Sequence, residues 1–230
     1  MNSTLSHRLR GATPPTRICL IAVMALCVGL LCTCRAFALP ISLFNTGVDN
    51  ANNVLPGFGS PDLHYSYSLT PGPTPPVTID QANWPIAGGP WVPNNPNSRW
   101  IGPSGQSNGP PGNYTYATQF TLPPLTNLST VSVGGLWGTD DWSVDIEINN
   151  ISTGQVSAGF TSLVPFSITS GFQIGVNTIE FMLTNAGGPT GLRVDKIQGS
   201  YSLIPEPTTI GLAAIGMVAA MLARRRLPST

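Results

Sequence analysis

The chain has 230 residues and a formal net charge of zero, and 9% of its residues are charged. That balance hides an uneven distribution, because residues 39–204 carry nine acidic and three basic side chains, a net charge of −6. An acidic segment of this kind excludes nucleic acid as a partner. All four cysteines precede residue 39, which excludes disulfides and cysteine metal sites from the rest of the chain.

The first 38 residues have the pattern of a Sec signal peptide. Three arginines precede an apolar run over residues 18–31, and small side chains follow at Ala36 and Ala38. This order predicts cleavage by signal peptidase after Ala38. A lipoprotein signal at one of the cysteines is the weaker alternative, because the residues before them suit lipidation poorly.

Residues 39–204 are predicted to form one all-β sandwich. They show no helical periodicity, and short alternating runs are bounded by Gly, Pro, Asn and Asp. The predicted strands cover residues 41–44, 64–69, 77–79, 114–122, 130–137, 143–148, 166–168, 177–184 and 192–203. In residues 144–148 the alternation places three apolar side chains on one face and Asp145 with Glu147 on the other. Asn149 and Asn150 then predict a hairpin turn, since Asn tolerates left-handed backbone.

The second half of this segment resembles the galactose-binding-like jelly rolls. An alternating strand ends at Asn149-Asn150, and the sequence Gly175-Val176-Asn177-Thr178-Ile179 follows later. In that family such a strand ends in Asn-Gly and is followed by Gly-x-Asn-x-Leu, so Asn150 and Ile179 are departures. The resemblance implies a jelly-roll fold whose members bind sugars in some proteins and only pack in others.

The acidic cluster offers two chemical interpretations. Asp140 and Asp141 are predicted to lie in a loop, where carboxylates can ligate a structural Ca²⁺ ion, although six to eight oxygens are needed. A secreted glycan-active hydrolase using this cluster is the alternative to a binding protein. It requires two carboxylates facing each other across a cleft, whereas Asp145 and Glu147 project from one strand. A solvated face is the simpler interpretation, and no cofactor is predicted.

The tryptophans are the best candidates for binding a ligand, because an exposed indole can stack on the C–H face of a sugar ring. Trp84, Trp91 and Trp100 lie in loop-rich sequence, and we interpret them as a carbohydrate-binding set. Their Pro and Gly neighbours also allow a packing role, in which the aromatic rings anchor a long loop. With His64 as its only histidine and no cysteine, the segment is predicted to be non-enzymatic.

The last 26 residues, 205–230, resemble the PEP-CTERM sorting signal of Gram-negative bacteria. Pro205, Glu206 and Pro207 precede an apolar run over residues 208–223, and Arg224, Arg225 and Arg226 close it. As a helix the run spans about 24 Å, close to the bilayer core, and the arginines stay on the cytoplasmic side. A short buried core helix is the alternative. In the family, the membrane protease exosortase recognises this tail and removes it near the tripeptide.

Together these segments predict an exported β-sandwich that the inner membrane holds until exosortase processes it. The cell surface or the extracellular matrix is then its destination. Exopolysaccharide is its expected contact, because PEP-CTERM systems are tied to extracellular polysaccharide production. Ice binding is a third alternative, but it would require a flat array of repeated threonines that the sequence lacks.

Replacing Glu206 with Ala should block processing, because it removes the central residue of the sorting tripeptide. We expect the wild-type surface protein to lose its C-terminus when exosortase is present, and the variant to keep it. Intact-mass analysis of the surface fraction measures this directly. Wild-type surface protein that retains Arg226 would rule out the sorting interpretation.

Overall fold

A computed structural model describes residues 37–69, 74–204 and 216, and the compact unit is Phe37–Ile204. The signal peptide up to residue 36 and the sorting tail, apart from Gly216, lie outside the described residues. Within the described part of the chain, no helix is long and apolar enough to cross a membrane. The predicted span over residues 208–223 falls almost entirely outside that part.

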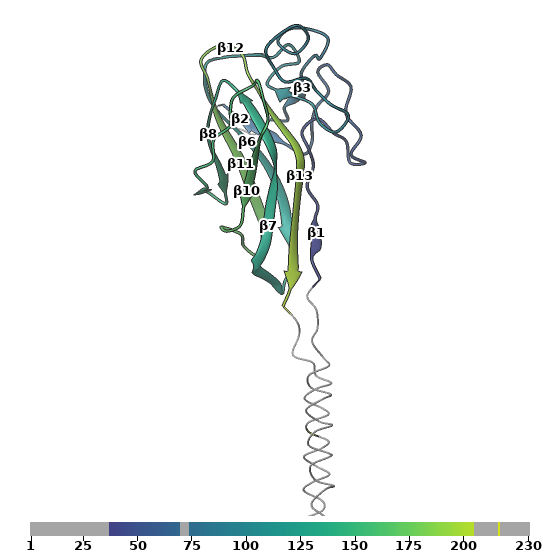
Figure 1. The fold of residues 1–230 in the computed structure, drawn as a ribbon, viewed down its shortest axis with the longest axis vertical. Coiled ribbons are helices and arrows are strands. Elements are labelled where there is room, and N and C mark those ends of the chain that lie inside the picture. Colours follow the sequence, from purple (N-terminus) through teal and green to yellow (C-terminus); the bar gives the residue numbers. More distant parts are fainter. Residues whose placement is uncertain (1–36, 70–73, 205–215, 217–230) are drawn as a thin grey trace, which may run out of the picture. The chain divides into compact units, whose positions relative to one another are not determined.

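Two antiparallel sheets form a sandwich, which confirms the all-β prediction (Figure 1). One sheet has the order β10 (Val164–Ile168), β7 (Thr126–Asp140), β13 (Gly191–Leu203), β4 (Ile101–Gly102) and β3 (Val77–Thr78), and β1 (Leu39–Ile41) also pairs with β13. The other has the order β2 (Ser66–Ser68), β6 (Gly112–Leu122), β11 (Gly175–Asn185), β8 (Trp142–Ile148) and β9 (Ile151–Ser152). β5 (Asn108–Gly109) and β12 (Gly188–Pro189) form a two-stranded ribbon.

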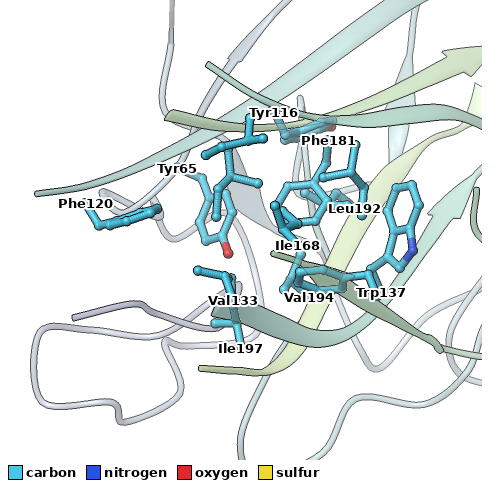
Figure 2. Close-up of a cluster of buried hydrophobic side chains, with 14 of the residues drawn as sticks. Tyr65, Tyr116, Phe120, Val133, Trp137, Ile168, Phe181, Leu192, Val194 and Ile197 are labelled. Carbon is cyan, nitrogen blue, oxygen red and sulfur yellow. The ribbon is translucent and has the colours of Figure 1, made fainter. Parts of the chain in front are cut away.

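The core between the sheets follows from the period-2 alternation of the long strands. On β11, Ile179, Phe181 and Leu183 are fully buried, whereas the residues between them are half-buried on the outer face. Phe181 packs against Trp137 and Phe166 of the facing sheet, with ring centroids 5.6 Å away in both cases. Figure 2 shows these inward side chains of both sheets meeting in one cluster. On β6 and β11 the alternation therefore specifies which face is buried, whereas β7 and β13 also bury consecutive residues over 137–140 and 191–195.

All nine predicted strands are present, with shifted ends, and the Asn149-Asn150 hairpin is confirmed by φ angles of 52° and 62°. The predicted faces of β8 are partly wrong. Its pairing with β11 shifts register between Met182 and Leu183, and this irregularity changes the alternation. As a result Val144 is 51% exposed while Asp145 is buried.

Residues 80–100 form a long loop with a small core of its own. Ile79, Ile86, Trp91 and Trp100 are buried together, and the two indole rings lie 4.3 Å apart between centroids. The Trp100 indole N–H donates to the carbonyl of Val92 at 2.9 Å. We call this group the loop core. Because of this core, the loop is held in one conformation although it has no regular secondary structure.

The side chain of Arg193 on β13 fastens this loop to the sandwich. It is 1% exposed, its Nε donates to Ser98 Oγ at 3.0 Å, and its Nη1 donates to the carbonyls of Val92 and Pro93. Burial lowers the pKa of Arg193, and the charge of Asp195 opposes that effect. A buried guanidinium is tolerated only when it is hydrogen-bonded. The loop supplies the acceptors that Arg193 needs, and Arg193 in turn holds the loop on the sandwich.

The chain ends of the domain and the long loop lie at opposite ends of β13. β1 and the end of β13 lie side by side, with Leu39 opposite Tyr201, so the chain enters and leaves the domain at one end (Figure 1). The start of β13 pairs at Gly191 with Asp140, and its Leu192 pairs with Ile101 just after the loop. At about 3.3 Å per residue, β13 separates these ends by about 40 Å.

Replacing Arg193 with Met should lower the free energy of unfolding by about 3 kcal/mol, because the buried Ser98 hydroxyl and the carbonyl of Pro93 lose their guanidinium donor. Lys196→Met is the matched control, since it removes the same charge from an exposed side chain of the same strand. We expect the control to change stability by less than about 0.5 kcal/mol. Denaturant unfolding measures both, and equal effects would show that Arg193 does not hold the loop.

Candidate functional site

A hollow of about 420 Å³ lies beside the loop core, at the end of the sandwich remote from Leu39. Its lining includes Phe58, Asp80, Asn83, Trp84 and Gln106. Phe58 is 59% exposed and Trp84 is 60% exposed, so two aromatic side chains border one depression with polar groups between them. We call it the Trp84 hollow.

Phe58 is held in place by the strand beneath it. The Thr78 hydroxyl donates to the carbonyl of Pro56 at 2.7 Å, and the backbone N–H of Gly59 donates to the carbonyl of Thr78 at 2.8 Å. A Cβ at Gly105 would lie 2.9 Å from the nitrogen of Gly59 and 3.1 Å from the Phe58 ring. Only glycine lets the two loops approach this closely, so the position of Phe58 is specified by backbone contacts.

Trp84 is held by the start of the long loop. The Asp80 carboxylate accepts the backbone N–H of Ala82 at 2.9 Å and the side-chain amide of Asn83 at 2.5 Å. Two residues after Trp84, Ile86 is buried in the loop core and its N–H donates to the carbonyl of Asn83. These contacts fix the backbone on both sides of an exposed indole.

The polar groups of the Trp84 hollow suit a ligand rich in hydroxyl groups. Asp80 is half-buried, and its carboxylate has acceptor sites beyond the two that Ala82 and Asn83 use. Asn83 and Gln106 are exposed, and their amides can both donate and accept. Aromatic faces, amides and a carboxylate together can bind a molecule with apolar C–H faces and hydroxyl edges.

Of the three predicted sugar-binding tryptophans, only Trp84 is exposed. Trp91 is 2% exposed and Trp100 is fully buried, so neither presents a ring face to a ligand, and both are corrected to loop-core residues. The sequence interpretation did not include Phe58, Asp80, Asn83 or Gln106. The sequence feature that could have identified Phe58 is Gly57-Phe58-Gly59, because it places a large aromatic residue between two glycines in a loop.

Asp140 and Asp141 do not form a solvated loop pair. Asp140 is buried, and its Oδ2 accepts the Trp91 indole N–H at 2.7 Å while its Oδ1 has no hydrogen-bond partner. Asp141 Oδ2 accepts the backbone N–H of Ala186 at 2.7 Å. Burial and, to a smaller extent, the neighbouring Asp141 carboxyl raise the pKa of Asp140 to about 7 against the opposing effect of the Trp91 hydrogen bond.

These residues fit a Ca²⁺ ion poorly. Asp140 and Asp141 each use one oxygen for a protein donor, and Ca²⁺ requires six to eight oxygen ligands. Within residues 37–69 and 74–204, no group of three or more acidic, His or Cys side chains is arranged to hold a metal. Asp140 instead anchors Trp91, and with it the loop core, to the end of β7.

The other two acids of the cluster have separate environments. Asp145 is buried, and its carboxylate accepts the Ser152 hydroxyl and the backbone N–H groups of Ile146 and Gln155. Glu147 is half-buried on the outer sheet face, directly opposite Glu180 of β11. Asp145 is therefore a structural acceptor that ties the β9 hairpin to β8.

Residues 203–226 match the family model described as the PEP-CTERM protein-sorting motif. The chain is thus marked as an exported protein that exosortase sorts to the cell surface in Gram-negative bacteria. None of the curated proteins matches it. Among solved structures, it is similar to the Stig cyclase Fisc from Fischerella sp. TAU in complex with (3Z)-3-(1-methyl-2-pyrrolidinylidene)-3H-indole. That similarity has 10% identity and a TM-score of 0.42, and it covers 74% of this chain and 100% of the other.

Replacing Asp140 with Asn should stabilise the protein at pH 8. Because the pKa of Asp140 is raised from about 3.8 to about 7 on folding, the wild-type protein loses stability as the pH rises between these values. Asn cannot ionise and still accepts the Trp91 N–H, so we expect a gain of about 1–3 kcal/mol at pH 8 that disappears near pH 4.

Thermal unfolding across this pH range measures the difference. Asp49→Asn is the control, because the backbone N–H of Asn53 lowers the pKa of Asp49 below its usual 3.8. Its difference from wild type should therefore arise below about pH 4 and stay constant between about pH 5 and pH 8. A pH-independent difference between Asp140→Asn and wild type would mean that Asp140 is not held protonated by the fold.

Proposed function

We propose that the sandwich is a non-catalytic carbohydrate-binding domain, which the sorting system delivers to the cell surface or the extracellular matrix. Its ligand is an extracellular polysaccharide, bound in the Trp84 hollow. The observation that carries the proposal is the pair of exposed aromatic side chains, Phe58 and Trp84, fixed on packed loops beside Asp80 and two amides. Aromatic rings that are already ordered bury area at little further cost in entropy.

The charge of the domain indicates which class of polysaccharide it binds. Residues 39–204 have a net charge of −6, and Asp80 lines the hollow itself. Both features repel uronic acids, sulfates and phosphates, whereas a carboxylate is a strong acceptor for sugar hydroxyl groups. The proposed ligand is therefore a neutral polysaccharide.

The location of the hollow suits a protein that is tethered or released at its C-terminus. The match to the sorting motif starts at residue 203, the last residue of β13, where the chain leaves the sandwich. The Trp84 hollow lies near the other end of that strand. In this arrangement exosortase and the inner membrane act at one end of the domain while the sugar is bound at the other.

A glycan-active hydrolase is less well supported. Such an enzyme requires two carboxylates on opposite sides of the scissile bond. Among the described residues lining the Trp84 hollow, Asp80 is the one carboxylate. Three acids of the predicted cluster, Asp140, Asp141 and Asp145, instead accept hydrogen bonds from Trp91, Ala186 and the β9 hairpin.

We also propose that the sandwich belongs to the galactose-binding-like jelly rolls. Contacts between the two motifs of that resemblance support the assignment. The Asn149 side-chain amide donates to Asn177 Oδ1 at 2.9 Å, and the backbone N–H of Thr178 donates to Asn149 Oδ1 at 2.9 Å. Asn177 is fully buried, so the hairpin turn and the start of β11 are joined through one buried amide.

A glycan array with neutral and anionic polysaccharides tests the function. We expect the wild-type protein to bind neutral members and Trp84→Ala to lower the affinity at least tenfold, which is about 1.4 kcal/mol. Val176→Ala is the control, because it truncates a residue that is 53% exposed on β11, outside the hollow. Neutral glycans bound equally well by wild type and Trp84→Ala would contradict the assignment of this site.

A further inference from the structure

We infer that the domain has a second sugar-binding site around Trp142, toward the opposite edge of the sandwich from the Trp84 hollow. One molecule then binds two polysaccharide chains and cross-links them. This inference rests on the proposed carbohydrate-binding function and adds a second site to it. None of the residues that carry it belongs to the predicted sugar-binding set.

The second site is a hollow of about 520 Å³ next to the start of β8. We call it the Trp142 hollow, and its lining includes Asp141, Trp142, Ser143, Ser157, Phe160 and Thr161. Trp142 is 65% exposed, and Phe160 is half-buried. The hollow thus repeats the chemistry of the first one: aromatic faces, a carboxylate and neutral hydrogen-bonding groups, here hydroxyl groups in place of amides.

The walls of the Trp142 hollow are fixed by hydrogen bonds. The Ser143 hydroxyl accepts the backbone N–H of Ser157 at 2.6 Å, and the Ser157 hydroxyl is 2.8 Å from that of Thr139 on β7. The N–H of Gly159 donates to Ser157 Oγ at 3.1 Å. The segment after β9 is therefore bound to both β7 and β8, which gives Trp142 a rigid setting.

The segments that line the two hollows contact opposite edge strands of one sheet. Near the Trp84 hollow, β3 is joined to the segment before β2 by the bridge between Pro61 and Val77. Near the Trp142 hollow, the segment after β9 is joined to β10 by hydrogen bonds between Gln155 and Ser167. β3 and β10 are the two outer strands of one sheet. Four strand spacings separate them, about 19 Å.

The loop core lies between the hollows and contacts both. Ile79 belongs to this core and lines the Trp84 hollow. Phe160 packs against the same core and lines the Trp142 hollow, and its carbonyl accepts the N–H of Val92 at 2.8 Å. A packed core between the hollows fixes their separation, so one short oligosaccharide cannot fill both.

Two fixed sites give the domain a function that one site cannot provide. A polysaccharide chain repeats its sugar unit, so each site can bind a different chain and join the two. Simultaneous binding also raises the overall avidity without any new contact. The proposed role is therefore the cross-linking of a neutral polysaccharide layer by a surface protein.

Two measurements on the full chain, purified in detergent, test this inference with a β-linked neutral glucan. Calorimetric titration with cellotriose, which is too short to span both hollows, should give two sites for the wild type, one each for Trp84→Ala and Trp142→Ala, and none for the double variant. In the second measurement, wild-type protein is first bound to a film of unlabelled hydroxyethyl cellulose. It should then capture labelled hydroxyethyl cellulose from solution. Either single variant should bind the film and fail to capture the labelled polymer.

The outcomes separate the two proposals. If Trp84→Ala removes all binding and Trp142→Ala changes nothing, the second site is wrong and the proposed function stands. If Trp142→Ala alone removes all binding, the domain binds sugar at one site only, and the Trp84 assignment fails together with cross-linking. A wild-type protein that binds neither glucan overturns both, and Val176→Ala serves as the unchanged control.

Discussion

The buried guanidinium of Arg193 is the interaction on which the arrangement of the binding end depends. It lies on the strand that pairs with β1, β4 and β7, and its donors bind the carbonyls and hydroxyl of residues 92–98. An unsatisfied charge at that position would be costly, so the loop must close over it. Once residues 92–98 are fixed, Trp91 reaches Asp140 and Trp100 reaches Val92, and the loop core forms between the two hollows. Exposed aromatic side chains are then presented on a packed base.

The same design fits a protein that folds outside the inner membrane. Residues 39–204 contain no cysteine, so the fold depends on core packing and hydrogen bonds and not on disulfide formation. The ends of the domain lie together at Leu39 and Tyr201, next to the start of the sorting motif. The sorting motif and the hollows that we propose to bind polysaccharide are thereby separated along β13. A cross-linking protein needs this separation, because its binding end must reach polysaccharide away from the membrane.

The sequence predicted the parts of the fold that depend on local alternation. The long strands and the Asn149-Asn150 turn were found because side-chain period and turn chemistry act over a few residues. The burial of Asp145 was missed, since it follows from a register shift against β11 that no local pattern encodes. Trp91 and Trp100 were misinterpreted for a related reason: an aromatic residue in a Pro- and Gly-rich loop looks the same in sequence whether it is exposed or packed. Phe58 borders the same hollow as Trp84 because Gly105 contacts both loops: it packs against Phe58, and its carbonyl accepts the N–H of Asp80 at 2.9 Å.

The most direct test of the account is a titration of the ¹⁵N-labelled protein with a neutral oligosaccharide, followed through the five tryptophan indole N–H signals. Trp84 and Trp142 are exposed, whereas Trp91, Trp100 and Trp137 are buried. The account predicts that the signals of Trp84 and Trp142 shift with saturation and that the other three stay in place. Saturable shifts confined to Trp91, Trp100 or Trp137, or no shift of Trp84 while the sugar binds, would contradict it.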